Sequence, residues 1–154
     1  MLPNGTLSLG SISVADPASS KKRILEQAAR LLAAHAEEPA AELIFERLLE
    51  RERLGSTGLA GGVALPHARM PGIDESRGAF LRLAEAVEFD ALDDQPVDLV
   101  FALLVPEDAT EEHLQLLAQL AAMFNDEELR NRLREAEAGE ALAILAGKST
   151  IHAA

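Results

Sequence analysis

The chain has 154 residues, of which 48% are apolar, and this size and composition suit a single domain with a hydrophobic core. Its 26 acidic and 14 basic residues give a formal net charge of -12, so the surface repels nucleic-acid phosphates and anionic lipid headgroups, and we expect no nucleic-acid partner. The sequence contains no cysteine, which excludes disulfides, thiolate metal sites and cysteine nucleophiles.

The N-terminal segment, residues 1–19, is rich in Ser, Gly, Asp and Pro, and its only candidate element is an edge strand at residues 11–14. It shows neither the basic nor the apolar region of a signal peptide, and no stretch approaches the roughly 18 apolar residues of a membrane span. We therefore expect a cytoplasmic protein without direct membrane insertion, with one domain at residues 20–150 after a poorly assigned segment.

Two helices are predicted next. The first starts after Ser20, and the second has Pro39 in its first turn and Gly55 at its C-terminal end, where a glycine is common. Apolar side chains recur at helical spacing in both. The two stripes consist of Ile24, Ala28, Leu31, Leu32 and His35 in the first helix, and of Ala41, Ile44, Phe45 and Leu48 in the second.

A glycine-rich loop follows and leads into a short strand. Glycines at 55, 58, 61 and 62 precede the apolar run Val63–Leu65, which Pro66 terminates before His67. The pattern predicts a strand that stops at a histidine.

Two further strands are predicted beyond this histidine. Residues 78–83 form one candidate. Residues 97–105 are almost continuously apolar, with Asp98 as the one charged residue, and alternation cannot explain this run. We expect residues 97–105 to form a central strand that is buried on both faces.

The C-terminal third is predicted to be helical. Thr110 is expected to cap a helix that runs through Phe124, Asn125 and Glu128 resemble a capping box, and Gly147 closes a last short helix. Together the elements predict an α/β fold, a single-domain three-layer α/β/α sandwich with a mixed β-sheet.

His67 is the leading candidate for chemistry because it follows a strand and a proline, which fix the backbone while exposing the side chain. The preceding glycines would allow a ligand to approach closely. A neutral imidazole has a free lone pair near pH 7, and phosphoryl transfer needs such a nucleophile with cations or N–H donors around it. Arg51, Arg53 and Arg69 are candidate cations. These residues alone leave open that His67 merely ends a strand.

His113 is the second candidate, because it lies in the first turn of a predicted helix, where N–H groups and the helix dipole favour an anion. Glu111 and Glu112 oppose this, and the alternative is an ordinary surface histidine. Arg51 has an alternative as well, since an arginine in a last helical turn complements the dipole or pairs with a neighbouring glutamate.

The loop Gly55, Ser56, Thr57 and Gly58 is expected to contact an oxyanion, although capping or turn hydrogen bonds are the alternative for its hydroxyl groups. His35 and His152 are expected to be structural or incidental.

No cofactor and no metal are expected. A site built from His67, His113 and a carboxylate lacks any paired histidine spacing. The glycine loop matches neither a phosphate-binding loop of nucleotide hydrolases nor a dinucleotide-binding loop.

Four segments in this order resemble the enzyme IIA domains of the fructose and mannitol class in the bacterial phosphotransferase system, and the nitrogen-related branch is most similar. They are RERLGSTG at 51–58, GVALPH at 62–67, PVDLVFALLVP at 96–106 and EHL at 112–114. The resemblance runs from about residue 20 to residue 147. Four motifs in one order are much more specific than any single motif.

The resemblance implies a mixed sheet between helical layers and a catalytic set of His67, His113 and Arg51. His67 would receive phosphate, which originates in phosphoenolpyruvate, from a phosphohistidine on an HPr-like carrier protein. His113 and Arg51 would contact the phosphoryl group. No role is transferred to Arg69, because relatives vary there.

Two functions are compatible with this resemblance. The chain is either a regulatory phosphocarrier whose phosphorylation state changes its binding to protein partners, or a sugar-specific enzyme IIA that passes phosphate to a IIB domain. No segment resembling a IIB or IIC domain is found in the chain, which favours the first. A binding module without transfer activity is disfavoured by the presence of His67, His113 and Arg51.

Overall fold

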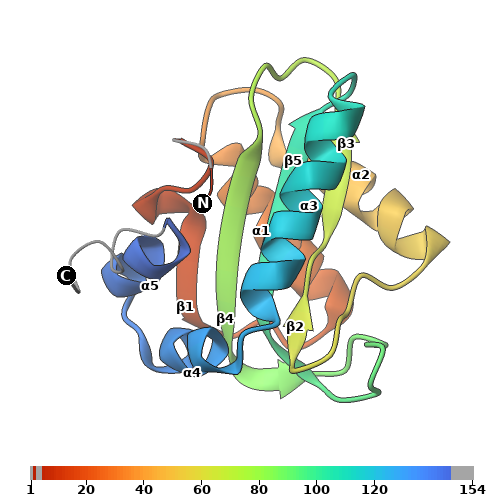
Figure 1. Ribbon diagram of the computed structural model, residues 1–154. Coiled ribbons are helices and arrows are strands. Elements are labelled where there is room, and N and C mark those ends of the chain that lie inside the picture. Colours follow the sequence, from red (N-terminus) through yellow and green to blue (C-terminus); the bar gives the residue numbers. More distant parts are fainter. Residues whose placement is uncertain (1, 3–4, 147–154) are drawn as a thin grey trace.

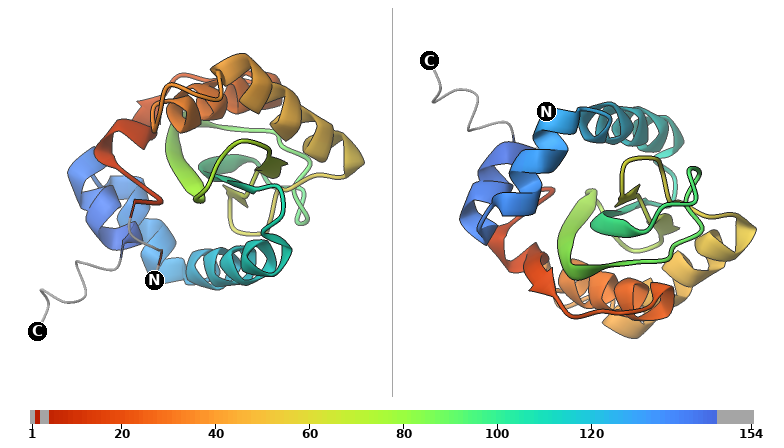
Figure 2. Two further views of the ribbon diagram at one scale, coloured as in Figure 1. Left: turned by 90° about the horizontal axis from the view of Figure 1, so that it is seen from above. Right: turned by 90° about the horizontal axis from the view of Figure 1, so that it is seen from below.

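The computed structural model describes residue 2 and residues 5–146 as a mixed five-stranded sheet between two layers of helices (Figure 1). Figure 2 shows the helices surrounding the sheet when the molecule is seen from above and below. The elements are η1 (Leu9–Ser11), β1 (Ile12–Asp16), α1 (Lys21–Ala33), α2 (Ala41–Leu54), β2 (Val63–Ala64), β3 (His67–Met70), β4 (Arg77–Val87), β5 (Val97–Pro106), α3 (Thr110–Phe124), α4 (Glu127–Glu135) and α5 (Ala138–Leu145). The predicted α/β sandwich with a mixed sheet is confirmed.

The sheet is organised around β5, as its continuous apolar sequence predicted. β5 pairs antiparallel with β4 on one side and parallel with both β2 and β3 on the other. Nine of its ten residues are buried, which accounts for the missing alternation. β4 is longer than the predicted strand at 78–83, because its pairing with β5 extends from Arg77 to Val87.

The predicted edge strand near the N-terminus exists as β1, which pairs parallel with β4. It spans residues 12–16 in place of 11–14, since Ser11 belongs to the short helical turn η1. This part of the N-terminal segment therefore completes the sheet.

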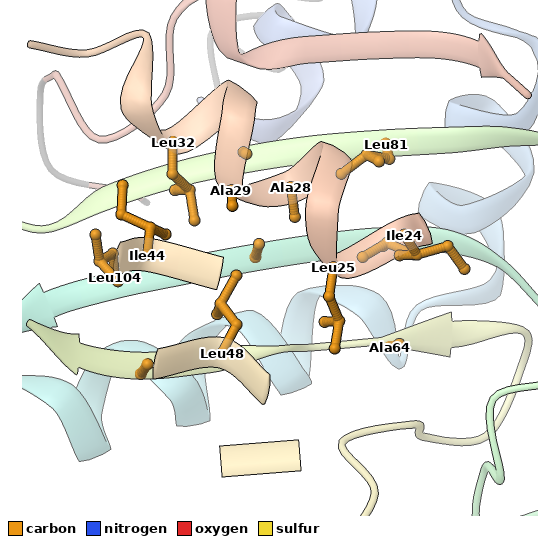
Figure 3. Close-up of a cluster of buried hydrophobic side chains, with 14 of the residues drawn as sticks. Ile24, Leu25, Ala28, Ala29, Leu32, Ile44, Leu48, Ala64, Leu81 and Leu104 are labelled. Atoms are coloured by element: carbon orange, nitrogen blue, oxygen red, sulfur yellow. The ribbon is translucent and has the colours of Figure 1, made fainter. Parts of the chain in front are cut away.

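Each face of the sheet carries its own hydrophobic core. α1 and α2 cover one face, where their leucine and isoleucine side chains meet strand residues such as Leu81 and Leu104 (Figure 3). The helices α3, α4 and α5 cover the other face, around Phe124, whose ring stacks on Phe80 and meets the Phe101 ring at a tilt. Full burial of each large apolar side chain is worth about 1.5–3 kcal/mol, so the two cores fix how both helical layers lie on the sheet.

The ends of the first two helices follow their local sequence closely. Ser20 is the N-cap of α1, where its hydroxyl accepts a hydrogen bond from the Arg23 N–H at 3.1 Å. Pro39 lies before α2 and not in its first turn, because Ala40 still has an extended backbone with ψ 154°.

The predicted caps of the later helices were shifted by one residue. Thr110 is the first residue of α3 and Ala109 occupies the N-cap position. Asn125 ends α3 in a helical conformation, so the cap of α4 is Asp126, whose carboxylate accepts the N–H of Glu128 at 2.9 Å. The predicted closing residue Gly147 lies outside the described residues.

Candidate functional site

His67 lies at the edge of the sheet, directly after an interruption at Pro66 that separates β2 from β3 without changing their register with β5. β2 pairs Val63 with Leu99, and β3 pairs His67 with Leu103, so the same offset continues on both sides of Pro66. Pro66 has no N–H to donate, but its carbonyl still accepts a hydrogen bond from the Leu103 N–H at 2.9 Å. The predicted short strand before the histidine is present as β2, which ends at Ala64, but the sequence did not indicate that pairing with β5 resumes at His67 as β3.

Among the residues that the structure describes, only one nitrogen of the His67 ring has a hydrogen-bond partner. Its Nδ1 lies 2.8 Å from the Leu65 carbonyl oxygen. Since a carbonyl only accepts hydrogen bonds, Nδ1 must carry the proton that is donated. In the neutral ring, Nε2 then carries the lone pair and can act as a nucleophile.

His113 lies beside His67 and is buried, with 7% of its surface exposed. The two ring centroids are 5.2 Å apart and the rings meet edge to face at 69°. Nδ1 of His113 is buried and has no hydrogen-bond partner among the described residues. The alternative of an ordinary surface histidine is therefore excluded.

Burial makes both histidines weaker bases than a free imidazole. The pKa of His67 is lowered chiefly by burial and further by the Arg51 charge, while the Leu65 hydrogen bond and the Glu52 charge act in the opposite direction. The pKa of His113 falls to about 4 through burial, with further contributions from His67, Arg69 and Arg51. Both rings are therefore neutral near pH 7, as a nucleophile and its polar neighbour require.

A cavity of about 570 Å³ lies over these histidines, between the last turns of α2 and the start of α3. It is lined by Arg47, Glu50, Arg51, Arg53, Leu54, His67, Ala68, Arg69 and His113. His67 and Arg69 point to the same face of β3, because alternate strand residues share a face. Four arginines against one glutamate make this cavity positive in a chain whose net charge is -12.

The structure brings all three predicted cations, Arg51, Arg53 and Arg69, to this cavity. Arg51 donates from Nη1 to the Gly55 carbonyl at 2.9 Å. Within the described part of the chain, none of the three forms an ion pair with a carboxylate. Such unpaired guanidinium groups are suited to an anion.

Arg47, which was not among the predicted cations, also lines the cavity and lies 3.8 Å from the Glu107 carboxylate. The sequence feature that could have identified Arg47 is its position four residues before Arg51, because this spacing places both arginines on the same face of α2.

In the loop Gly55–Gly58, which was expected to contact an oxyanion, both hydroxyl groups donate to other parts of the protein. The Ser56 hydroxyl donates to the Phe89 carbonyl at 2.8 Å, and the Thr57 hydroxyl donates to the Glu52 carboxylate at 2.6 Å. The described residues that line the cavity include none of these four loop residues. The alternative of structural hydrogen bonds therefore fits the geometry.

The glycines of this region make room for other parts of the protein. A Cβ on Gly58 would lie 2.8 Å from the Ala91 Cα, and one on Gly62 would lie 2.7 Å from Arg134 Nη2. The loop also covers the outer side of β2, where the Leu65 N–H donates to the Thr57 carbonyl at 3.0 Å. Gly58 and Gly62 are therefore required by the close packing of protein atoms around them.

Of the two remaining histidines, His35 does not line the cavity. Nε2 of His35 lies 2.9 Å from the Gly78 carbonyl oxygen, a structural contact of the kind expected. His152 lies outside the described residues. The described residues contain no cluster of three or more side chains suited to a metal, and none of their helices is long and apolar enough to span a membrane.

Comparison with protein-family models matches residues 6–147 to "Phosphoenolpyruvate-dependent sugar phosphotransferase system, EIIA 2". This chain belongs to the EIIA 2 family. It is therefore a phosphotransferase component of the enzyme IIA type, as the four motifs indicated, and members of the family transfer phosphate through a phosphohistidine.

Three relatives define its position in the family. A nitrogen regulatory protein of Pseudomonas aeruginosa is 55% identical over 126 residues, which cover 82% of each chain. A fructose-specific EIIA component of Haloferax volcanii is 36% identical over 126 residues, again 82% of each chain. The crystal structure of the nitrogen regulatory protein IIA-Ntr from Neisseria meningitidis has a TM-score of 0.84 at 46% identity, covering 91% of this chain and 96% of that one. The predicted resemblance to the nitrogen-related branch is confirmed.

Proposed function

We propose that Nε2 of His67 accepts a phosphoryl group from a phosphohistidine on an HPr-like carrier protein. The observation that carries this proposal is the hydrogen bond from Nδ1 to the Leu65 carbonyl, which leaves the lone pair on Nε2 at an arginine-lined cavity. The new bond forms between Nε2 and phosphorus while the phosphorus–nitrogen bond of the donor breaks. The electron pair of that bond returns to the donor's ring nitrogen.

Arg51 and His113 are proposed to stabilise the transferred group. Both line the cavity, and Arg51 is fixed there by the Gly55 carbonyl. The His113 ring is held beside His67 by its burial, with the two ring centroids 5.2 Å apart. Fixed donors of this kind stabilise developing charge without reorganising during the reaction.

We propose a regulatory role, in which phosphorylation of His67 changes the affinity for protein partners in the cytoplasm. Its support is the higher identity to a nitrogen regulatory protein, 55%, than to a fructose-specific EIIA component, 36%. The second relative also supports an alternative, in which the chain passes phosphate to a IIB domain.

Incubation with phosphoenolpyruvate, the general phosphotransferase enzyme and an HPr-like carrier tests the proposal directly. Intact mass spectrometry should show one added phosphoryl group on the wild-type chain and none on His67→Ala. His35→Ala, with a ring outside the cavity, is the matched control and should be labelled. Labelling of His67→Ala, or an adduct on Ser56 or Thr57, would exclude His67 as the acceptor.

A further inference from the structure

Glu52 lies in the last turn of α2, yet its side chain is only 4% exposed. Desolvation and the negative end of the helix dipole both oppose a buried carboxylate at this position. Three donors compensate for this. The Thr57 N–H and the Lys21 ammonium each lie 2.9 Å from Oε2, and the Thr57 hydroxyl donates to Oε1 at 2.6 Å. The carboxylate thus joins α1, α2 and the following loop.

The loop that Glu52 holds also positions Arg51. The Gly55 N–H donates to the Glu52 backbone carbonyl at 3.2 Å, and the Gly55 carbonyl accepts from Arg51 Nη1 at 2.9 Å. Gly55 and Thr57 are separated by a single residue, so fixing Thr57 restricts where the Gly55 carbonyl can lie. The orientation of the guanidinium group therefore depends on the buried carboxylate.

Building on the phosphoryl transfer proposed above, we propose that Glu52 is a positioning residue, whose carboxylate fixes Thr57 and thereby the Gly55 carbonyl that holds Arg51 beside His67. Glu52 does not touch the phosphoryl group, since the described residues that line the cavity do not include it. Its negative charge has a second effect, because it raises the pKa of His67 against the opposing effect of Arg51.

The first test is the single-turnover transfer rate of Glu52→Gln. A carboxamide offers one oxygen acceptor in place of two, so at least one of the three donors loses its partner. We expect transfer to slow by about tenfold to a hundredfold, as for a modest displacement of a group near the reacting atoms.

The matched control is Asp98→Asn, which also converts an ion-paired carboxylate to an amide. Asp98 pairs with Arg134 at 2.9 Å, and along β5 it lies about 16 Å from Leu103, the partner of His67. Its transfer rate should remain that of the wild type whatever its effect on stability. Equal slowing of both variants would indicate general destabilisation and would overturn the proposal.

A double-mutant cycle tests whether Glu52 affects the transfer rate through Arg51 or independently of it. If Glu52 acts through Arg51, Glu52→Gln should slow transfer no further in an Arg51→Ala background. If the double variant were instead slowed by the product of the two single effects, the proposal would be overturned.

If Glu52→Gln fails to fold, Thr57→Val and Thr57→Ser replace it in the cycle, because only the serine variant keeps the hydroxyl donor. Thr57→Val should be slow and Thr57→Ser close to wild type.

An NMR pH titration of the His67 ring provides a readout that does not depend on transfer. Removing the Glu52 charge should lower the pKa of His67, whereas an unchanged pKa together with an unchanged rate would reject the role of Glu52. Failure of the proposed function has a different signature, namely an unlabelled wild-type chain or a labelled His67→Ala variant.

Discussion

The imidazole rings of His67 and His113 meet edge to face, with centroids 5.2 Å apart, although β3 supplies one ring and α3 the other. Nδ1 of His67 is engaged by a backbone carbonyl, whereas Nδ1 of His113 has no hydrogen-bond partner in the described part of the chain. The His67 ring is thus oriented by the backbone, and the His113 ring is held beside it by burial.

The first prediction concerns the atom that is modified. The phosphoryl group should be attached to Nε2 of His67, because Nδ1 donates its proton to the Leu65 carbonyl. Nitrogen-15 NMR of the phosphorylated chain distinguishes the two nitrogens. The adduct should also be lost in acid, since a phosphoramidate hydrolyses when its nitrogen is protonated. An adduct on Nδ1 would show that the ring turns before it reacts.

Arg51→Ala should slow phosphoryl transfer by on the order of 10²–10³, the usual cost of removing one oriented donor. Its thermal stability should change little, because Arg51 is half-buried and forms no ion pair with the described residues. Rapid-quench labelling and thermal unfolding measure the two effects. Arg30→Ala, which removes an exposed arginine of α1, should transfer at the wild-type rate; equal slowing in both would point to a loss of overall charge.

His113→Ala should reduce both the transfer rate and the stability. The side chain is buried, so its removal leaves a cavity as well as a missing donor or acceptor. This distinguishes it from Arg51→Ala in the same pair of measurements. A His113→Ala variant that transferred at the wild-type rate would restrict this histidine to a structural role.

The lowered pKa of His113 makes stability depend on pH. The group has a pKa of about 4 when folded and about 6.5 when unfolded, so the unfolded chain binds the extra proton between these values. Its contribution to stability is complete above pH 6.5 and is lost as the pH falls toward 4. Melting temperatures of wild type and His113→Gln measured across this window should show the steeper decline for the wild type. Parallel curves would mean that the ring titrates normally in the folded protein.

Phosphorylation should act as an electrostatic switch at the cavity. A phosphoryl group brings negative charge next to the arginines, so it should weaken the binding of any partner that places an acidic or apolar face over His67. His67→Asp should reproduce this effect only in part, and His67→Ala should behave as unphosphorylated protein. Calorimetric titration of a partner against the three forms tests this. Equal affinity in all of them would favour simple relay of phosphate to a downstream carrier.

Much of the fold could be predicted because its signals are local. The apolar run of β5 and the Ser20 cap depend on neighbouring residues, and the structure has both. The predicted stripe of α1 is buried at Ile24, Ala28 and Leu32, whereas His35 lies beyond the end of the helix at Ala33. The break at Pro66 was interpreted as the end of a strand because the sequence does not show that the Leu103 N–H reaches across to the proline carbonyl.

The site was predictable where residue type decides chemistry and unpredictable where distant contacts decide it. His67, Arg51, Arg53 and Arg69 all line the cavity. The roles of the loop hydroxyls depended on partners that the sequence cannot place nearby, such as the Phe89 carbonyl, 33 positions from Ser56. The burial of His113 likewise depends on how α3 packs against the sheet.

The interruption at Pro66 has a consequence for how the molecule meets other chains. β2 and β3 form an outer edge of the sheet, and an exposed edge is where strands of different molecules can join. Here the edge is divided into β2, with two residues, and β3, with four. The Leu65 N–H, next to β2, already donates a hydrogen bond to the Thr57 carbonyl. So short a free strand is a poor template for strand addition or fibre growth. The edge that carries His67 can therefore stay open to solvent, and encounters there are expected to use side chains over the cavity instead of backbone pairing.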